Sequence, residues 1–204
     1  VRYNLVASTG SYPIGSLTVY NGKLYGVTAE GGSNSGGVIF ELNPTGWVYS
    51  VKHNFTLTTG FAPYSTMAVY NSKLYGLTSE GGANYQGALF EFDPATTTYT
   101  LKYSFNFTNG SYPSGSLAVS GTSLYGVATW GGANSAGALF QYNVSTSTFT
   151  LKYSFASALT GTGRRPKGGL LLYNSKLYGS TLAGGTNGVG VLYEYDPAAS
   201  TYSV

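Results

Sequence analysis

The chain has 204 residues, of which 8% are charged and 16% are aromatic, and it contains no cysteine. A disulfide framework and a cysteine-based metal site are therefore excluded, and the small net charge of +3, spread along the chain, predicts no nucleic-acid partner. No stretch approaches the roughly 18 apolar residues of a membrane-spanning helix, so we expect no membrane insertion.

The sequence repeats itself four times with a period near fifty residues. Leu-Tyr-Gly at 24–26 returns at 74–76, 124–126 and 177–179, and a Gly-Gly pair follows each copy. The fourth copy is displaced by three residues inserted within 156–163. Such a period is typical of architectures in which each unit buries its apolar face on its neighbours. We predict a single domain over 1–204, with repeats at 1–50, 51–100, 101–150 and 151–204.

The second copy, taken in chain order, predicts four strands joined by short turns and one glycine-rich loop. The expected strands are 65–70, 73–78, 88–92 and 97–105, with turns at 71–72 and 93–95 and the loop at 80–87. Four antiparallel strands in a repeat of this length predict a propeller blade. The expected fold is therefore all-β, a β-propeller of four blades, each a four-stranded antiparallel sheet.

These motifs also carry a resemblance to a known family. The series Leu-Tyr-Gly-x-Thr, Gly-Gly-x-Asn, Gly-x-Leu/Ile-Phe-Glu, Asn/Asp-Pro and Lys-Tyr-Ser-Phe resembles the GloVer (Gloeo-Verruco) repeat, with the closest match at 74–84. The third copy departs from it at Ala128, Trp130 and Val144. The resemblance implies a propeller-like fold and a secreted or surface-anchored protein. It implies no agreed catalytic residues.

The ends of the chain bear on how the blades close. Thr201–Val204 and Val1–Leu5 fall in the same part of the repeat, so in a closed ring of four blades they would lie end to end in one outer strand. Two alternatives stay open: two chains forming an eight-bladed ring, and a piece of a longer repeat array.

The low charge and the resemblance together predict an extracellular protein, either secreted or on the cell surface. In a glycosylating pathway, four Asn-x-Ser/Thr sequences would offer sites for N-linked glycans. The candidate glycosylation residues are Asn54, Asn106, Asn109 and Asn143.

The residue inventory argues against an enzyme. The one histidine, His53, takes a strand position where the other copies have tyrosine, so neither a Ser-His-Asp triad nor a His-rich metal site is expected. We expect no metal and no cofactor. The carboxylates before the third turn, Glu41, Glu91 and Glu194, are interpreted as structural, as are Asp93 and Asp196 in the turn itself. Glu30 and Glu80 open the glycine-rich loops, and a glycoside hydrolase or lyase using them is a minor alternative.

Residues that differ between copies mark where a site would lie. The loop between strands two and three and the segment leading into strand one should share one end of each blade. Aromatic, amide and carboxylate groups at such a surface suit carbohydrate recognition. The candidate ligand-binding residues are Tyr12, Glu30, Asn34, Glu80, Asn84, Tyr85, Tyr112, Trp130, Asn134, Arg165 and Asn187. Trp47 is expected to begin an outer strand and to serve packing.

Two function classes follow. The first is a non-catalytic extracellular binding or adhesion module, lectin-like, whose partner is a glycan or another extracellular surface protein. The alternative is a structural protein that builds a sheath, surface layer or filament by self-association of propeller units.

Overall fold

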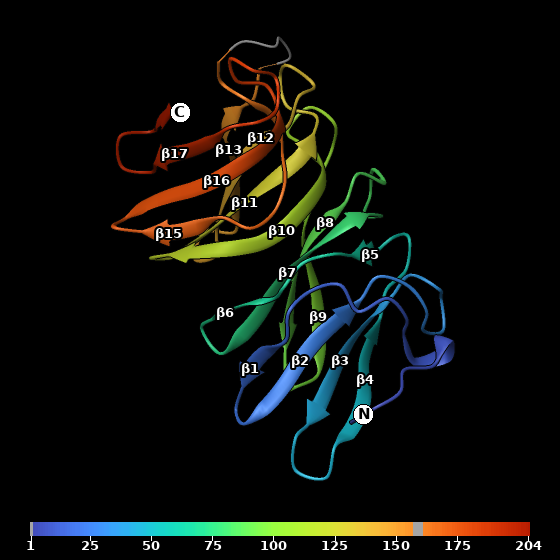
Figure 1. Cartoon of the computed structure of the whole chain (residues 1–204). Coiled ribbons are helices and arrows are strands. Elements are labelled where there is room, and N and C mark those ends of the chain that lie inside the picture. The colour runs from blue at the N-terminus through green and yellow to red at the C-terminus, as the bar shows by residue number, and fades with distance from the viewer. Residues whose placement is uncertain (1, 157–160) are drawn as a thin grey trace. The chain divides into compact units, whose positions relative to one another are not determined.

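A computed structural model describes residues 2–156 and 161–204, so the insertion expected within 156–163 lies partly outside the described residues. The chain forms two compact units, Val1–Ser104 and Phe105–Val204. Each unit contains two antiparallel sheets, and these are the predicted blades (Figure 1). The all-β prediction is confirmed: the only helical segment within the described part is the 3-10 turn η1, Ala7–Thr9.

Unit 1 holds blades 1 and 2. Blade 1 has the strand order β1-β2-β3-β4, and blade 2 has the order β5-β7-β8-β9 with β6 also paired to β7. The bounds are β1 (Thr18–Tyr20), β2 (Lys23–Thr28), β3 (Val38–Asn43), β4 (Val48–Asn54), β5 (Phe61–Pro63), β6 (Ala68–Tyr70), β7 (Lys73–Glu80), β8 (Ala88–Asp93) and β9 (Thr98–Ser104).

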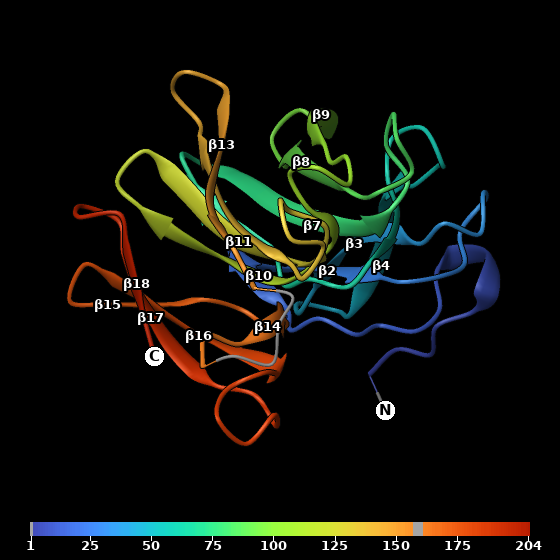
Figure 2. The ribbon, with the colours of Figure 1, turned by 90° about the horizontal axis from the view of Figure 1, so that it is seen from above.

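Unit 2 holds blades 3 and 4. Blade 3 has the order β10-β11-β12-β13, and blade 4 has the order β14-β16-β17-β18 with β15 also paired to β16, as Figure 2 shows from above. The bounds are β10 (Ser111–Ser120), β11 (Ser123–Trp130), β12 (Ala138–Asn143), β13 (Thr148–Ser154), β14 (Arg164–Pro166), β15 (Leu171–Tyr173), β16 (Lys176–Ala183), β17 (Leu192–Asp196) and β18 (Thr201–Ser203).

The turns form where the sequence predicted them. In blade 1, Asn21 and Gly22 both have positive φ, 48° and 70°, which is the type I′ geometry that matches the twist of a hairpin. The third turn is capped by its Asx side chain: the carboxylate of Asp93 accepts from Ala95 N at 2.9 Å, and that of Asp196 accepts from Ala198 N at 2.9 Å. The structural interpretation of both aspartates is confirmed.

Three details of the predicted strands were wrong. The first strand of blade 2 is not 65–70 but two pieces, Phe61–Pro63 and Ala68–Tyr70, because the chain leaves the sheet between them. Residues 2–6, expected in an outer strand, form no strand. Trp47 does not begin the outer strand: it lies in the turn with φ 55°, and β4 starts at Val48.

The core of each unit lies between its two blades. We call the side of a blade that packs on the following blade its forward face, and the opposite side its rear face. In unit 1, the forward face of blade 1 is buried against the rear face of blade 2. The forward residues are Tyr25, Val27 and Ile39, and the rear residues are Met67, Leu74, Phe90 and Phe92.

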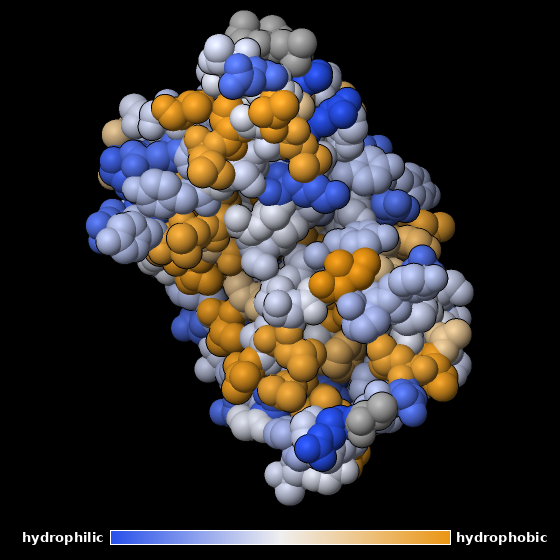
Figure 3. Space-filling view, viewed as in Figure 1, coloured by the Kyte–Doolittle hydropathy of each residue, from blue (hydrophilic) through white to orange (hydrophobic). Residues whose placement is uncertain are grey.

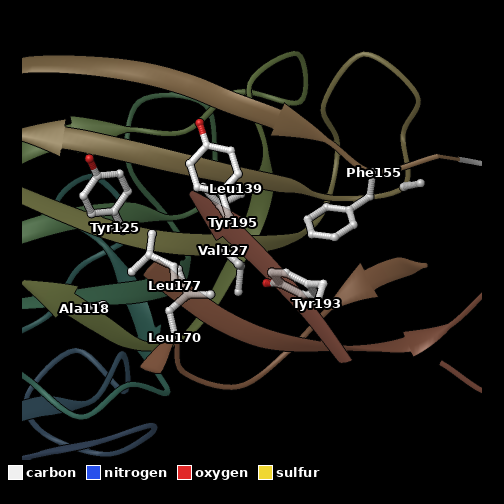
Figure 4. Packing of buried hydrophobic residues seen from close by; sticks show 10 residues of the cluster. Ala118, Tyr125, Val127, Leu139, Phe155, Leu170, Leu177, Tyr193 and Tyr195 are labelled. Carbon is white, nitrogen blue, oxygen red and sulfur yellow. The ribbon is translucent and has the colours of Figure 1, made fainter. Parts of the chain in front are cut away.

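Unit 2 repeats this interface with equivalent residues (Figure 4). Tyr125, Val127 and Leu139 form the forward face of blade 3, and the rear face of blade 4 is made by Leu170, Leu177, Tyr193 and Tyr195. Burial of such apolar surface is the main force that holds neighbouring blades of a repeat protein together. One interface design therefore recurs along the chain.

Candidate functional site on the loop ends of the blades

The segment leading into each blade lies beside the start of its glycine-rich loop, as the sequence predicted. The same cross-strand pairing recurs in all four blades: Ser11 with Glu30, Phe61 with Glu80, Ser111 with Trp130, and Arg164 with Ala183. The varying loop residues and the varying lead-in residues therefore share one end of each blade.

Neighbouring blades within a unit are also tied together at this end. The amide of Arg165 in blade 4 donates to the carbonyl of Ala136 in the blade 3 loop at 2.7 Å, and Ala62 donates to Gly36 at 3.0 Å in unit 1. Arg165 and Ala62 both have positive φ, 56° and 52°, although each precedes a proline. Their strained backbone is held by these bonds, so the lead-in side chains have a fixed direction.

Trp130 and Arg165 form the centre of the candidate site. The guanidinium carbon of Arg165 lies 4.1 Å from the centroid of the Trp130 ring, within the range of a cation–π contact. Trp130 ends β11 of blade 3, and Arg165 is in β14 of blade 4, so blade packing in unit 2 brings them together. Trp130 remains 36% exposed, which leaves aromatic surface beside a positive charge.

Two further candidates lie at the loop end of blade 3, as Trp130 does. Tyr112, 43% exposed, follows Ser111, the cross-strand partner of Trp130. Asn134 is exposed on the same blade's loop, and its amide nitrogen donates to the carbonyl of Phe155 at 3.1 Å. The loop end of blade 3 therefore carries an exposed aromatic ring and an amide in addition to the Trp130–Arg165 pair.

The other loop residues keep the predicted positions at the loop ends of their blades. Each loop asparagine is the third residue of a turn closed by a backbone bond, such as Tyr85 N to Gly82 O at 3.2 Å. Tyr85 and Tyr12 are 62% and 64% exposed. The exposed asparagines at these turns are Asn34, Asn84, Asn134 and Asn187. Glu30 and Glu80 lie on separate blades, each beside its own lead-in segment.

The remaining glutamates are bound into a network at the other end of the blades. The Glu91 carboxylate accepts from Lys73 Nζ at 2.7 Å and from the Tyr75 hydroxyl at 2.6 Å, and Lys102 Nζ lies 3.5 Å away. Burial raises the pKa of Glu91, but the hydrogen bonds from Lys73 and Tyr75 and the charge of Lys102 outweigh it, so its pKa is below the ordinary value.

Glu41 in blade 1 has the equivalent partners Lys23, Tyr25 and Lys52, and Glu194 in blade 4 accepts from Lys176 and Tyr178. The pKa values of both glutamates are also lowered. In blade 3 both charges are replaced: Gln141 donates to the hydroxyl of Ser123 at 2.7 Å. The sequence does carry a signal for this network, because Ser123 and Gln141 replace the lysine and the glutamate together in the third copy. The positions taken one at a time do not show it. The structural interpretation of these glutamates is confirmed.

His53 is a packing residue. Its ring stacks on Tyr99 with the centroids 3.9 Å apart, as Tyr153 stacks on Tyr202 in unit 2 at 4.1 Å. Nε2 is buried and has no hydrogen-bond partner among the described residues. Burial lowers the pKa of His53 to about 4. The interpretation of His53 as a substitute for tyrosine is confirmed.

The candidate glycosylation residues use their side chains in local structure. Asn54 Oδ1 accepts from Ser33 N at 2.8 Å, and Asn106 Oδ1 accepts from Asn109 N at 3.1 Å. Asn143 caps its turn through Oδ1, while its Nδ2, the atom that would carry a glycan, donates to Thr122 at 3.2 Å. Glycosylation stays a prediction at all four positions.

The described residues contain neither a cluster of metal-binding side chains nor a helix that could span a membrane. Within 2–156 and 161–204, no three His, Cys, Asp or Glu side chains gather in a way that could hold a metal ion. In the same residues, no helix is long and apolar enough to cross a membrane.

Comparison with solved structures shows the fold. The chain is similar to TolB from Acinetobacter baumannii, with a TM-score of 0.57 and 12% identity over 89% of this chain and 40% of that chain. It is also similar to a Bacteroides thetaiotaomicron protein of unknown function, with a TM-score of 0.61 and 17% identity over 96% of this chain and 44% of that chain. A third similar structure is the extracellular domain of a protein from the same organism described as a hybrid two-component system. Its TM-score is 0.66, with 12% identity over 100% of this chain and 23% of that chain.

At these identities the similarity concerns the fold alone, which is β-propeller-like. The chain spans less than half the length of each of these structures. No curated protein matches it. The sequence profile of the Gloeobacter/Verrucomicrobia repeat, however, matches residues 12–204, so the chain belongs to this repeat family, as its Leu-Tyr-Gly and Gly-Gly motifs predicted.

Proposed function

We propose that the chain is a non-catalytic extracellular binding module that recognises carbohydrate through the Trp130–Arg165 site. The observation that carries the proposal is the contact between Arg165 and the partly exposed ring of Trp130 at the loop ends of two packed blades. Aromatic rings stack on the C–H faces of sugars, and guanidinium groups donate to oxygen acceptors.

The charge at the site favours a sugar that carries a carboxylate. The guanidinium of Arg165 stacks on the Trp130 ring, and a stacked guanidinium donates in its own plane, where it can pair with an acidic group; Arg–carboxylate pairs are among the strongest charge-assisted bonds. Tyr112 and Asn134 add exposed aromatic and polar surface at the loop end of blade 3. A uronic-acid polymer is therefore the ligand class that the site suits best.

The absence of catalysis is part of the proposal. Glu41 and Glu91 are held in ion pairs with lysines, away from the loop ends. Glu30 and Glu80 belong to separate blades, whereas glycosidases use two carboxyls about 5–10 Å apart across one sugar. An extracellular location is supported by the low charge of the chain and by its similarity to an extracellular domain.

Tryptophan fluorescence can test this proposal. The chain has two tryptophans, so the Trp47→Phe variant leaves Trp130 as the sole reporter. We expect hexagalacturonate to change the emission of this variant saturably, with a weaker response to neutral cellohexaose. Equal responses would retain carbohydrate binding but remove the preference for acidic sugars. If neither sugar, nor any member of a wider glycan panel, changed the emission, the proposed function would be wrong.

A further inference from the structure

The rear face of blade 1 carries an open apolar pocket. Its volume is about 580 Å³, and six of its lining residues are Leu17, Leu24, Phe40, Leu42, Trp47 and Tyr49. Figure 3 shows apolar side chains gathered over β1–β4, at the lower end of the view. Within unit 1, blade 2 packs on the forward face of blade 1 and leaves this rear face open.

The repeat identifies what kind of surface fits the pocket. Leu17, Leu24, Phe40 and Leu42 occupy the positions of Met67, Leu74, Phe90 and Phe92 on the rear face of blade 2. That face is covered by the forward residues Tyr25, Val27 and Ile39. As a result Met67 is 3% exposed, whereas Leu17 is 47% exposed. The pocket is therefore half of an interface whose other half is a forward face of this same repeat.

The forward face of blade 4 is the matching half. Leu192 occupies the position of Ile39 and Leu139, and it is 81% exposed while both of those residues are fully buried. Two neighbouring positions of blade 4 also carry larger apolar side chains than the alanines of other blades. Leu182, 56% exposed, stands where blade 1 has Ala29, and Val189, 81% exposed, stands where blade 3 has Ala136.

We propose that the rear face of blade 1 binds the forward face of blade 4 of a second copy of this chain, so that chains associate head to tail. In the bound state Leu192 of one copy contacts the Leu17–Phe40 surface of the next, as Ile39 contacts the rear face of blade 2 within unit 1. Both surfaces are apolar and open, so burying them against each other stabilises the contact through the hydrophobic effect.

Such a contact is heterologous, since it joins two different surfaces of the same chain. Each chain has one of each surface, so association continues until a ring closes or a filament grows. Blocking either surface on all chains stops it. A chain blocked on its forward face still has an open rear face, and a chain blocked on its rear face still has an open forward face. A mixture of the two can therefore form one head-to-tail contact and no more.

Light scattering over a series from micromolar to millimolar concentration tests the proposal. The variants are Leu192→Asp on the forward face, Leu17→Asp on the rear face, and Leu57→Asp as the control, because Leu57 is 53% exposed and lies on neither face. Circular dichroism and thermal unfolding establish that each variant is folded. Since all three positions are already exposed, the substitutions leave the core intact.

We expect the mass of the wild-type chain and of Leu57→Asp to rise with concentration. Leu192→Asp and Leu17→Asp should each stay monomeric, and an equimolar mixture of the two should form one-to-one dimers and nothing larger. A wild-type chain that stays monomeric throughout would overturn the proposal. A mixture that remains monomeric, or a control that is blocked like the face variants, would overturn it as well.

Discussion

Gly76 lies directly against the ring of Phe90, so closely that a Cβ on this glycine would overlap the ring. Its φ is not positive, so the backbone conformation does not require glycine here. The same contact recurs between the glycine of each Leu-Tyr-Gly motif and an aromatic residue of the next strand. The other pairs are Gly26 with Phe40, Gly126 with Phe140, and Gly179 with Tyr193. Close packing of strand two against strand three thus explains why the motif repeats.

Gly76→Ala should destabilise the protein. The added methyl group forces the Phe90 ring, which is fully buried, out of its position, and overpacking of this kind costs about 1–3 kcal/mol. The free energy of unfolding in urea measures the loss. Gly161→Ala is the control, because none of the described residues beyond its chain neighbours comes within 4 Å of a Cβ at Gly161. If the two variants were equally stable, the packing explanation of the motif would fail.

Glu91→Ala should be more costly than the equivalent change in blade 3. Removing the carboxylate leaves Lys73 and Tyr75 without their acceptor, and we expect a loss of about 2–4 kcal/mol. Gln141→Ala removes only a neutral bond to Ser123, for which the expected loss is about 1 kcal/mol. Urea unfolding of both variants compares them, and equal losses would contradict a special role for the ionic network.

His53 should make stability depend on pH between its unfolded and folded pKa values. Burial lowers its pKa from 6.5 to about 4, so the unfolded chain binds the proton more tightly than the folded one. The contribution of His53 to stability is therefore complete above pH 6.5 and falls by about 3 kcal/mol as the pH drops toward 4.

The His53→Tyr variant isolates this effect, because tyrosine occupies the same position in the other three copies. Its stability should be flat from pH 6.5 down to about 5, with a decline only below about 4.5, where the glutamates take up protons in the unfolded chain while their lowered pKa keeps them ionised in the folded chain. Thermal unfolding across this range checks both proteins. An unchanged slope between pH 6.5 and 5 in the variant would show that another group causes it.

The sequence predicted the features that depend on local chemistry. Alternating apolar residues gave the strands at 73–78 and 88–92 within a few residues of β7 and β8. Asn-Gly and Asp-Pro gave the turns, because these residues favour the backbone geometry and capping bonds that turns need. Equivalent patterns occur in all four copies of the repeat, so each strand and turn is supported by four separate stretches of sequence.

Short pairings and long-range contacts could not be predicted in this way. β5 and β14 have three residues each and contain a proline, too little for an alternating pattern to show. The contact between Trp130 and Arg165 depends on how blade 4 packs on blade 3, which no spacing along the chain expresses. The sequence predicts both as ligand-binding residues because they differ from their equivalents in the other copies. Their contact is visible only in the packed unit.

Calorimetric titration of hexagalacturonate into the wild-type chain and two tryptophan variants tests the proposed binding site most directly. Trp130→Ala removes the ring under Arg165, whereas Trp47→Ala removes the ring of the chain's other arginine–tryptophan contact, with Arg2 at 4.8 Å. We predict that Trp130→Ala binds at least about tenfold more weakly, a loss of roughly 1.4 kcal/mol, and that Trp47→Ala binds like the wild type. Equal affinities for Trp130→Ala and the wild type would contradict the proposed site.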